Sequence, residues 1–571
     1  MSSLKAYVKV DENEQARLEA CRRTRKRITI ISLSSMLLVA IVVGAVVGTG
    51  VFRKNPINND AQQAKSISTA VKAVCDVTLY KDSCYNSLAP VAKSGQLKPE
   101  DLFKLSMQMA FNELSKASQR LRNDASLSGS VTENKTISEL GNCRDLLSLA
   151  MDHLNNSLYH TGGNVLDAVD DLRTWLSSVA TYQQTCIDEL EDGKLKATLQ
   201  AYLLNSAELT SNSLAIITWI YRVASSMKMR RLLNYNTRDK TPKWFHPKDR
   251  KLVQSSSDFK RKADAVVAKD GTGKYKTIGA ALKSVSDKSS KRFVIYVKKG
   301  VYVENVRVEK SKWNVMIVGD GMNTTIVSGK LNFVDGTPTF STATFAVFGK
   351  GFIARDMGFR NTAGAIKHQA VALMSTADQS IFYRCSFDAF QDTLYAHSNR
   401  QFYRECDIYG TVDFIFGNSA VVFQNCNIFP RQPLNGQKNT ITAQGRFDPN
   451  QNTGISVQNC TILPFGNLKS VQTYLGRPWK NYSTTIFMQS MMGSLIDPSG
   501  WLPWTGNTAP PTIFYVEYQN LGPGASTKKR VHWKGLKTNV ANKVVTQYTT
   551  KSFIQGGKWI QDTGTTYKNG L

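Results

Sequence analysis

Histidine is scarce in this sequence, and the common catalytic motifs built on histidine, serine or cysteine are missing. The six histidines show no metal-ligand spacing, and no Cys-x-x-Cys pair stands where a zinc site would need one. No Gly-x-Ser-x-Gly elbow occurs, so a serine esterase of the α/β-hydrolase fold has no support. A phosphate loop is absent as well. The sequence therefore gives no support for zinc, serine-esterase or phosphate-loop chemistry.

Acidic residues are also few, because 44 Asp and Glu face 72 Lys and Arg, a net charge of +28. The excess is uneven along the chain. Residues 221–262 carry 13 basic and 3 acidic residues, and residues 263–571 carry 35 and 18, whereas residues 63–220 carry 14 and 18. A basic surface attracts polyanions, either nucleic acid or an acidic polysaccharide. Charge alone does not choose between these partners, nor does it exclude a role in solubility.

One segment near the N-terminus has no charged side chain over 25 residues, from 28 to 52. A bilayer needs about 20 apolar residues, and the apolar part of a cleaved signal peptide is shorter. Residues 1–27 end in the basic cluster Arg22, Arg23, Arg25, Lys26 and Arg27. The positive-inside rule then predicts a cytosolic tail over 1–27 and a transmembrane signal anchor over 28–52, in type II orientation.

The cysteines agree with an oxidising compartment. Cys21 falls on the cytosolic side, and the other eight, an even number, follow the anchor. Five Asn-x-Ser/Thr patterns are compatible with secretion, although such triplets also arise by chance. Because the basic half of the chain then lies across the membrane from nucleic acid, we expect no nucleic-acid partner. An acidic polysaccharide remains.

Residues 66–220 are predicted to form an all-α four-helix bundle. Leucine, alanine and methionine recur there at spacings of three and four, as in Leu102, Leu105 and Met109. Four cysteines in this segment indicate two disulfides. Residues 221–261 are polar and basic and contain two prolines, so they are predicted to be a linker. The pair Arg230-Arg231 within it is a candidate site for a processing protease.

From residue 262 to about 560 the composition changes to short runs of Val, Ile, Phe and Thr separated by Gly and Asn. A repeat is visible in Ile381-Phe-Tyr-Arg-Cys385-Ser-Phe387 and Gln401-Phe-Tyr-Arg-Glu-Cys406-Asp-Ile408. Further copies end on Cys426 and Cys460, and the first two cysteine steps are 406 − 385 = 21 and 426 − 406 = 20. Strand composition with a period near 20 and no helix in each repeat predicts an all-β right-handed parallel β-helix.

A leucine-rich repeat is the alternative, but its Leu and Asn pattern is missing. In a β-helix, equivalent positions of successive coils stack about 4.8 Å apart. The column Cys385, Cys406 and Cys426 would then be internal. Two of the three could form a disulfide, or all could be small core residues.

The same period aligns polar residues. The spacings 391 − 369 = 22 and 413 − 392 = 21 place Gln369, the pair Gln391-Asp392, and Asp413 on three consecutive coils. Two neighbouring carboxylates repel when both are ionised, so one pKa rises while the other falls. That is what an acid and a nucleophile working at one pH require. The glutamine amides can donate hydrogen bonds to a developing oxyanion.

Five ordered segments make the C-terminal half resemble pectin methylesterases. They are Gly300-Val-Tyr-Val-Glu304, Gln369-Ala-Val-Ala-Leu373, Gln391-Asp-Thr-Leu-Tyr395, Gly410-Thr-Val-Asp-Phe-Ile-Phe-Gly417 and Leu475-Gly-Arg-Pro-Trp479. The bundle resembles the pectin methylesterase inhibitor domain, although related bundles inhibit invertases instead. Two departures from the family are visible: Phe390 stands where the family usually has Tyr, and the turn from Gly336 to Thr339 lacks a Trp often found there.

The resemblance implies an ester hydrolase acting on methyl-esterified homogalacturonan. Asp413 would be the nucleophile, Asp392 the proton donor and Gln391 an oxyanion stabiliser. The implied substrate contacts are Thr339, Gln369, Arg477 and Trp479. The expected disulfides are Cys75–Cys84, Cys143–Cys186 and Cys406–Cys426. The enzyme would be a membrane-anchored precursor in the secretory pathway and act in the cell wall after cleavage of the linker.

Three other interpretations stay open at this point. A pectin lyase or polygalacturonase would share the β-helix, because fold does not fix function. A wall-binding or inhibitory protein with a decayed β-helix is a non-enzymatic alternative. The N-terminal bundle, finally, could silence the enzyme until the linker is cut, or only assist its folding.

Overall fold

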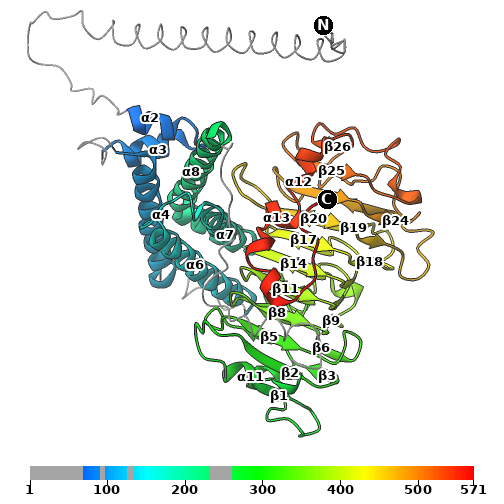
Figure 1. The fold of residues 1–571 in the computed structure, drawn as a ribbon. Helices are drawn as coiled ribbons and strands as arrows, with labels where there is room; N and C mark the ends of the chain where they lie inside the picture. Colours follow the sequence, from blue (N-terminus) through cyan, green and yellow to red (C-terminus); the bar gives the residue numbers. More distant parts are fainter. Residues whose placement is uncertain (1–68, 91–96, 125–133, 232–259) are drawn as a thin grey trace, which may run out of the picture. The chain divides into compact units, whose positions relative to one another are not determined.

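The computed structural model describes residues 69–90, 97–124, 134–231 and 260–571. Helices occupy the part before residue 232, and parallel strands dominate the part after residue 260 (Figure 1). Within these described residues no helix is long and apolar enough to cross a membrane. The predicted cytosolic tail and the predicted anchor, residues 1–27 and 28–52, lie outside them.

The helical part contains four long helices and a short helical hairpin in front of them. The helices are α2 (Thr69–Cys75), α3 (Lys81–Leu88), α4 (Pro99–Asn123), α6 (Asn134–His160), α7 (Val169–Asp188) and α8 (Gly193–Arg231). Their leucines and alanines, spaced by three and four, face one another in a common core, as in Leu102, Leu146 and Leu176. This is the predicted four-helix bundle.

Two disulfides fix the bundle. Cys75–Cys84 closes the α2–α3 hairpin, and Cys143–Cys186 joins α6 to α7. Both pairs are those expected from the sequence. Helix α8 continues to Arg231, into the segment predicted as a linker, so Arg230 and Arg231 belong to its last turn. The helix extends because residues 221–231 contain no proline or glycine to end it.

The second part is a parallel β-helix whose every strand pairing is parallel. The strands form three sheets of 11, 7 and 8 strands, and the central coils contribute one strand to each. Figure 1 shows the strands as a stack of arrows. The first sheet contains β1 (Ala265–Val267), β2 (Phe293–Val297), β5 (Val315–Val318), β8 (Ile353–Arg355), β11 (Ser380–Tyr383), β14 (Arg400–Arg404), β17 (Ala420–Gln424), β20 (Gly454–Gln458), β23 (Thr484–Met488), β25 (Phe514–Tyr518) and β26 (Leu536–Lys537).

The other two sheets complete each coil. The second sheet contains β4 (Val306–Val308), β7 (Phe345–Val347), β10 (Leu373–Ser375), β13 (Leu394–Ala396), β16 (Ile415–Gly417), β19 (Asn439–Gln444) and β22 (Thr473–Gly476). The third sheet contains β3 (Gly300–Val303), β6 (Thr325–Gly329), β9 (Gly358–Asn361), β12 (Ser386–Asp388), β15 (Asp407–Gly410), β18 (Asn427–Pro430), β21 (Thr461–Ile462) and β24 (Met491–Met492). The chain visits the first, third and second sheets in turn.

Stacked aromatic rings fill the interior of the β-helix. Phe382 pairs in register with Tyr403, which pairs with Phe423 on the next coil. Their ring centroids are 4.7 Å apart at each step. Because equivalent positions repeat at the strand spacing, identical side-chain types stack directly. The aromatic repeat in the sequence is therefore the core of the coil stack.

The cysteine column lies beside these rings, at the turn from the first to the third sheet. Cys385, Cys406, Cys426 and Cys460 are all buried and all free, so the predicted Cys406–Cys426 disulfide is wrong. Each thiol contacts the backbone of a neighbouring coil instead. The Cys406 Sγ receives the Cys385 N–H at 3.5 Å and donates to the Phe382 carbonyl at 3.3 Å. The column behaves as the small buried core residues that the sequence left as the alternative.

Short helices pack against the β-helix. Helix α11 (Ile278–Lys283) packs against β1 and β4 at the first coil. After the last strand, α12 (Asn542–Thr546) and α13 (Thr550–Phe553) pack on the first sheet, where Val545 clusters with Ile486 and Phe553 clusters with Phe402. The C-terminal residues then run back along the first sheet, where the Lys568 N–H donates to Gln424 Oε1 at 2.8 Å. In the described part of the chain, these segments thus cover one face of the first sheet.

Candidate functional site

The predicted polar residues meet at the turn from the third sheet to the second. Gln369 precedes β10, Gln391 and Asp392 precede β13, and Asp413 precedes β16. Gln369 and Gln391 form a parallel bridge, so they lie on neighbouring coils. Both aspartates have left-handed backbone, with φ of 61° and 52°, a conformation that Asp adopts more readily than most residues. The four side chains therefore line one short stretch of three coils.

Asp413 is held by three donors. Arg477 reaches its two carboxylate oxygens in parallel, with Nε 2.8 Å from Oδ1 and Nη2 2.5 Å from Oδ2. Thr440 on β19 donates its hydroxyl to Oδ1 at 2.7 Å and accepts the Asp413 backbone N–H at 2.8 Å. A bidentate guanidinium and a hydroxyl donor stabilise the ionised carboxylate and fix its direction. Asp413 is thus presented as an oriented anion.

The surroundings of Asp392 favour its protonated form, in contrast to those of Asp413. Its side chain is buried, and this burial raises the pKa of its carboxyl well above the ordinary value. The negative charge of Asp413 adds to the rise, and the Arg477 guanidinium opposes it. Two carboxyl groups on adjacent coils are therefore driven to different protonation states. One can attack while the other can give a proton.

Aromatic side chains form a wall beside the two aspartates. Tyr395 stacks on Phe416 with centroids 4.1 Å apart, and Trp479 lies 6.3 Å from Phe416. Trp504 lies against Arg477, whose Cζ is 4.3 Å from the Trp504 ring centre. A Cβ at Gly445 would lie only 2.8 Å from the Trp479 ring, so glycine is needed there for Trp479 to lie close. Such a wall suits a sugar ring, which presents apolar faces.

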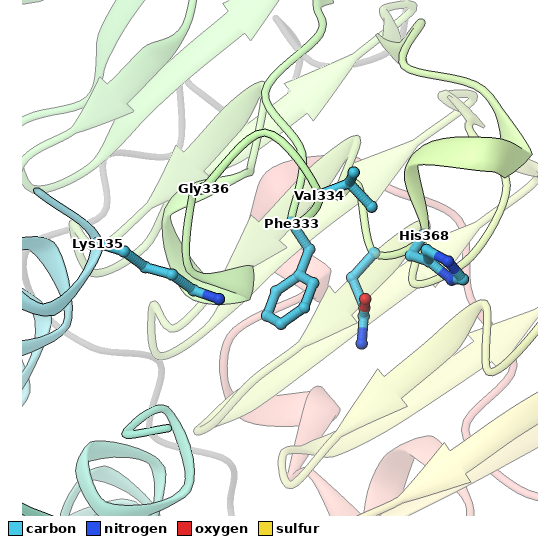
Figure 2. A pocket seen from close by; sticks show the side chains of 6 residues that line it. Lys135, Phe333, Val334, Gly336 and His368 are labelled. Atoms are coloured by element: carbon cyan, nitrogen blue, oxygen red, sulfur yellow. The ribbon is translucent and has the colours of Figure 1, made fainter. Parts of the chain in front are cut away.

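An open cavity of about 530 Å³ adjoins the Gln369 side of the site. Phe333, Val334, Gly336 and His368 line it together with Gln369 and, from helix α6, Lys135. Figure 2 shows the Lys135 side chain extending towards Phe333, and its Nζ lies 4.0 Å from the centre of that ring. The turn from Gly336 to Thr339 that was singled out in the sequence therefore borders the site.

The end of helix α7 supplies polar groups to the same place. Asp188 forms an ion pair with Lys480, with Oδ2 2.8 Å from Nζ. Glu189 accepts the backbone N–H of Phe340, next to Thr339, at 3.2 Å. The charge of Glu189 also acts on Asp392 and raises its pKa further. The bundle thus places two carboxyl groups against the residues that line the site.

Apolar side chains of the bundle and of the β-helix also pack together around Asp188 and Glu189. One hydrophobic cluster contains the bundle core together with outward-facing residues of the β-helix, among them Met374, Tyr395 and Phe416. With the bundle in place, Asp392 is 8% exposed and Asp413 is 5% exposed. Thr185 and Asp188 of α7 line a small cavity together with Tyr395 and Trp479.

Two buried histidines also lie where the bundle contacts the β-helix. His397 Nε2 lies 2.9 Å from the Thr185 hydroxyl of α7. His153 of α6 lies 3.4 Å from the Asn399 amide nitrogen. Burial lowers the pKa of His153 to about 4 and that of His397 to about 3. Both rings are therefore neutral where the bundle meets the β-helix.

The structure brings together most of the residues predicted as a site. Gln369, Gln391, Arg477 and Trp479 lie in one region with Asp392 and Asp413. Thr339 precedes Phe340, whose backbone N–H donates to Glu189. Thr440, Trp504 and Lys480 were not singled out from the sequence. Thr440 follows Asp413 by 27 residues rather than about 21, so the period gave no signal for it. In the described part of the chain, no three His, Cys, Asp or Glu are grouped as a metal would require.

Two protein families match different parts of the chain. The family described as Pectinesterase matches residues 264–557. The family described as Plant invertase/pectin methylesterase inhibitor matches residues 69–216. The first match coincides with the β-helix and the second with the helical bundle.

Curated relatives share the whole arrangement. The chain is 55% identical over 568 residues to the probable pectinesterase/pectinesterase inhibitor 46 of Arabidopsis thaliana, covering 98% of this chain and 99% of that protein. It is 48% identical over 594 residues to pectinesterase 3 of Phaseolus vulgaris, with both chains fully covered. The solved pectin methylesterase from carrot is 52% identical, with a TM-score of 0.54, over 98% of that chain and 54% of this one.

Proposed function

This chain belongs to the pectinesterase family, and we propose that it demethylesterifies cell-wall homogalacturonan through an aspartyl nucleophile. The observation that carries the mechanism is the contrast between the two carboxyl groups. Asp413 is an anion oriented by Arg477 and Thr440, whereas burial and the Asp413 charge favour the protonated form of Asp392.

The reaction would proceed in two steps. An Asp413 oxygen attacks the C6 carbonyl of a methyl galacturonate unit, and the Gln391 and Gln369 amides donate to the oxyanion. Asp392 gives its proton to the departing methanol. Asp392 then takes a proton from a water molecule, which cleaves the acyl-enzyme and releases a galacturonate carboxylate and free Asp413. No step requires a metal or a cofactor.

Methanol release from esterified pectin, measured beside chain cleavage, tests this proposal. We expect methanol without shortening of the polymer, whereas a lyase or galacturonase would shorten it. Asp413→Ala should abolish methanol release while preserving the circular dichroism of the fold. Asp407→Ala removes a carboxylate from the outside of β15 and is the matched control. Methanol release by Asp413→Ala at the rate of the control would refute the mechanism.

The bundle would act as an inhibitor of the same chain. The support is that the end of α7 places Asp188 and Glu189 against residues of the site and that Asp392 and Asp413 are buried in the uncut chain. Removal of the bundle would follow cleavage of the segment after α8, near Arg230-Arg231. Replacing both arginines by Gln should then leave the precursor uncut in plant secretory extracts. Normal release of the β-helix from that variant would exclude this pair as the processing site.

The precursor would be anchored by residues 28–52, and the mature enzyme would act in the cell wall. The net charge of residues 263–571, with 35 basic and 18 acidic residues, supports retention on the demethylated polymer. Raising ionic strength should therefore release the mature enzyme from wall material. Retention that does not respond to salt would show that charge is not the cause.

A further inference from the structure

A threonine on the coil after Asp413 holds one oxygen of that carboxylate. Thr440 lies in β19 and is 1% exposed. Its hydroxyl accepts the Asp413 backbone N–H at 2.8 Å and donates to Asp413 Oδ1 at 2.7 Å. A threonine hydroxyl has a single proton to donate, and here that proton goes to the carboxylate. Thr440 therefore binds the backbone and the side chain of Asp413 at the same time.

The backbone keeps this hydroxyl beside Asp413. The Thr440 N–H donates to the Thr411 carbonyl at 3.1 Å, and the Thr440 carbonyl accepts the Phe414 N–H at 3.3 Å. Thr411 and Phe414 lie on either side of Asp413 in the sequence of the preceding coil. These inter-coil hydrogen bonds flank the aspartate and limit the movement of the threonine relative to it. The donor is thus part of the sheet rather than of a loop.

The two oxygens of Asp413 have unequal numbers of donors. Oδ1 receives Arg477 Nε at 2.8 Å as well as the Thr440 hydroxyl. In the described part of the chain, Oδ2 has Arg477 Nη2 as its donor, at 2.5 Å. Each carboxylate oxygen can accept about two hydrogen bonds. Both acceptor positions of Oδ1 are therefore occupied, while Oδ2 keeps a lone pair that can attack an ester carbon.

We propose that Thr440 is a positioning residue that holds Oδ1 through both chemical steps, so that Oδ2 bonds to the substrate and Asp413 leaves readily afterwards. This inference rests on the proposed function. In the first step the Oδ2–C6 bond forms, the C6–O bond to the methyl group breaks, and the methanol takes the Asp392 proton. In the second step the oxygen of a water molecule bonds to C6, and one water proton goes to Asp392. The C6–Oδ2 bond breaks, its electron pair returns to Asp413, and the acid that is formed loses its proton to solvent.

The Thr440 hydrogen bond acts differently on the two steps. Asp413 is charged before the first step and neutral in the acyl-enzyme, so the hydrogen bond stabilises the carboxylate before it attacks. In the second step the charge returns to Asp413 as its bond to C6 breaks. A fixed donor on Oδ1 stabilises that developing charge. Removal of the hydroxyl should therefore slow the breakdown of the acyl-enzyme more than its formation.

The test uses Thr440→Val, which keeps the branched shape of the side chain and removes the hydroxyl. Thr440→Ser keeps the hydroxyl and removes the methyl group. The matched control is Thr325→Val in β6, because Thr325 is also buried and its hydroxyl also accepts an aspartate N–H, that of Asp320 at 2.9 Å. Each protein is cut at a protease site inserted between residues 232 and 259 and freed from the bundle. The β-helix is a folded protein by itself in the carrot relative.

Steady-state kinetics on esterified pectin and a rapid-quench measurement of methanol are the readouts. Thr440→Val should release a burst of about one methanol per enzyme molecule before a slow steady rate. Its kcat should fall about 30-fold, the loss expected for a hydrogen bond to a charged group, while kcat/KM changes less than about threefold. Thr440→Ser and Thr325→Val should keep kcat within about threefold of the wild type.

Three results would overturn the inference. They are an unchanged kcat in Thr440→Val, an equal loss of kcat and kcat/KM without a burst, and a loss in Thr440→Ser as large as that in Thr440→Val. A purely structural role of Thr440 predicts the second result, because misfolded enzyme lowers both constants together. The proposed function is judged separately, by methanol release from the wild type and its loss in Asp413→Ala. If the wild type releases no methanol, the proposed function fails and the inference fails with it.

Discussion

We expect the affinity of the bundle for the β-helix to fall as the pH rises above neutrality, because Glu189 loses a proton. Burial raises the pKa of this carboxyl to about 8, and the charges of Glu139 and Asp188 add to the rise. When the bundle is docked on the β-helix, the Glu189 carboxyl therefore favours its protonated form. Glu189→Gln keeps the shape of that form but cannot lose a proton.

The sign follows from the raised pKa. The contribution of Glu189 to docking is fully present below its ordinary pKa of 4.5 and is lost as the pH rises towards 8. Each pH unit in that window changes the docking free energy by about 1.4 kcal/mol. This value is an upper bound, because part of the side chain remains in contact with solvent.

Two histidines act in the opposite direction at lower pH. His153 and His397 are neutral in the docked state, with pKa values of about 4 and about 3. Once released they would bind protons below their ordinary value of 6.5, so acid weakens docking. Between pH 4.5 and 6.5, the effect of the two histidines on the docking free energy is larger than the opposite effect of Glu189, so docking weakens as the pH falls. Between pH 6.5 and 8, Glu189 acts alone among these three groups. Because the slope falls to half at the pKa of about 8, docking should weaken by about 1.6 kcal/mol, or about 16-fold.

The assay is the dissociation constant of the bundle from the chain cut between residues 232 and 259, measured at pH 6.5 and pH 8. Wild type should show the change of about 16-fold, and Glu189→Gln should show less than threefold. Glu191→Gln is the matched control, because Glu191 is exposed and pairs with Lys135. The other titratable groups of the site are common to wild type and Glu189→Gln, so the difference between these two proteins reports Glu189. The same pH slope in Glu189→Gln and wild type would refute the reasoning.

Three further substitutions test other parts of the structure. Arg477→Lys should lower kcat about 100-fold, since lysine cannot make two parallel hydrogen bonds to Asp413, and steady-state kinetics would show a loss below threefold if this is wrong. Replacing Cys143 and Cys186 by Ala should lower the unfolding free energy of the bundle by about 4 kcal/mol, for a loop of 43 residues. Urea titration measures this, and a change below 1 kcal/mol would contradict it. Phe382→Ala should cost about 3–5 kcal/mol in the same assay, because it leaves a cavity in the stacked core.

The sequence was sufficient for the coil stack and for the two aspartates, because both depend on a short and regular period. The steps of 20 and 21 between Cys385, Cys406 and Cys426 correspond to in-register strand pairs in the structure. Asp392 and Asp413 follow the same step, so their proximity was predictable. Arg477 could be placed only through resemblance, since 64 residues separate it from Asp413.

Other parts could not be predicted, for identifiable reasons. The loop between β18 and β19 breaks the period, which concealed Thr440. No spacing rule connects a bundle residue such as Asp188 with Lys480, 292 positions later. The predicted Cys406–Cys426 bridge assumed that adjacent cysteines bond, whereas the neighbouring backbone offers their thiols hydrogen bonds.

The separation of the catalytic carboxyl groups is a property of the backbone. Asp392 and Asp413 occupy equivalent turns of adjacent coils, and parallel strands lie about 4.8 Å apart in any sequence that forms them. The β18–β19 loop already shows that a coil can accept extra residues without disturbing this pair. Loops can therefore diverge in length and composition, and substrate preference with them, while the dimension on which the chemistry depends stays the same.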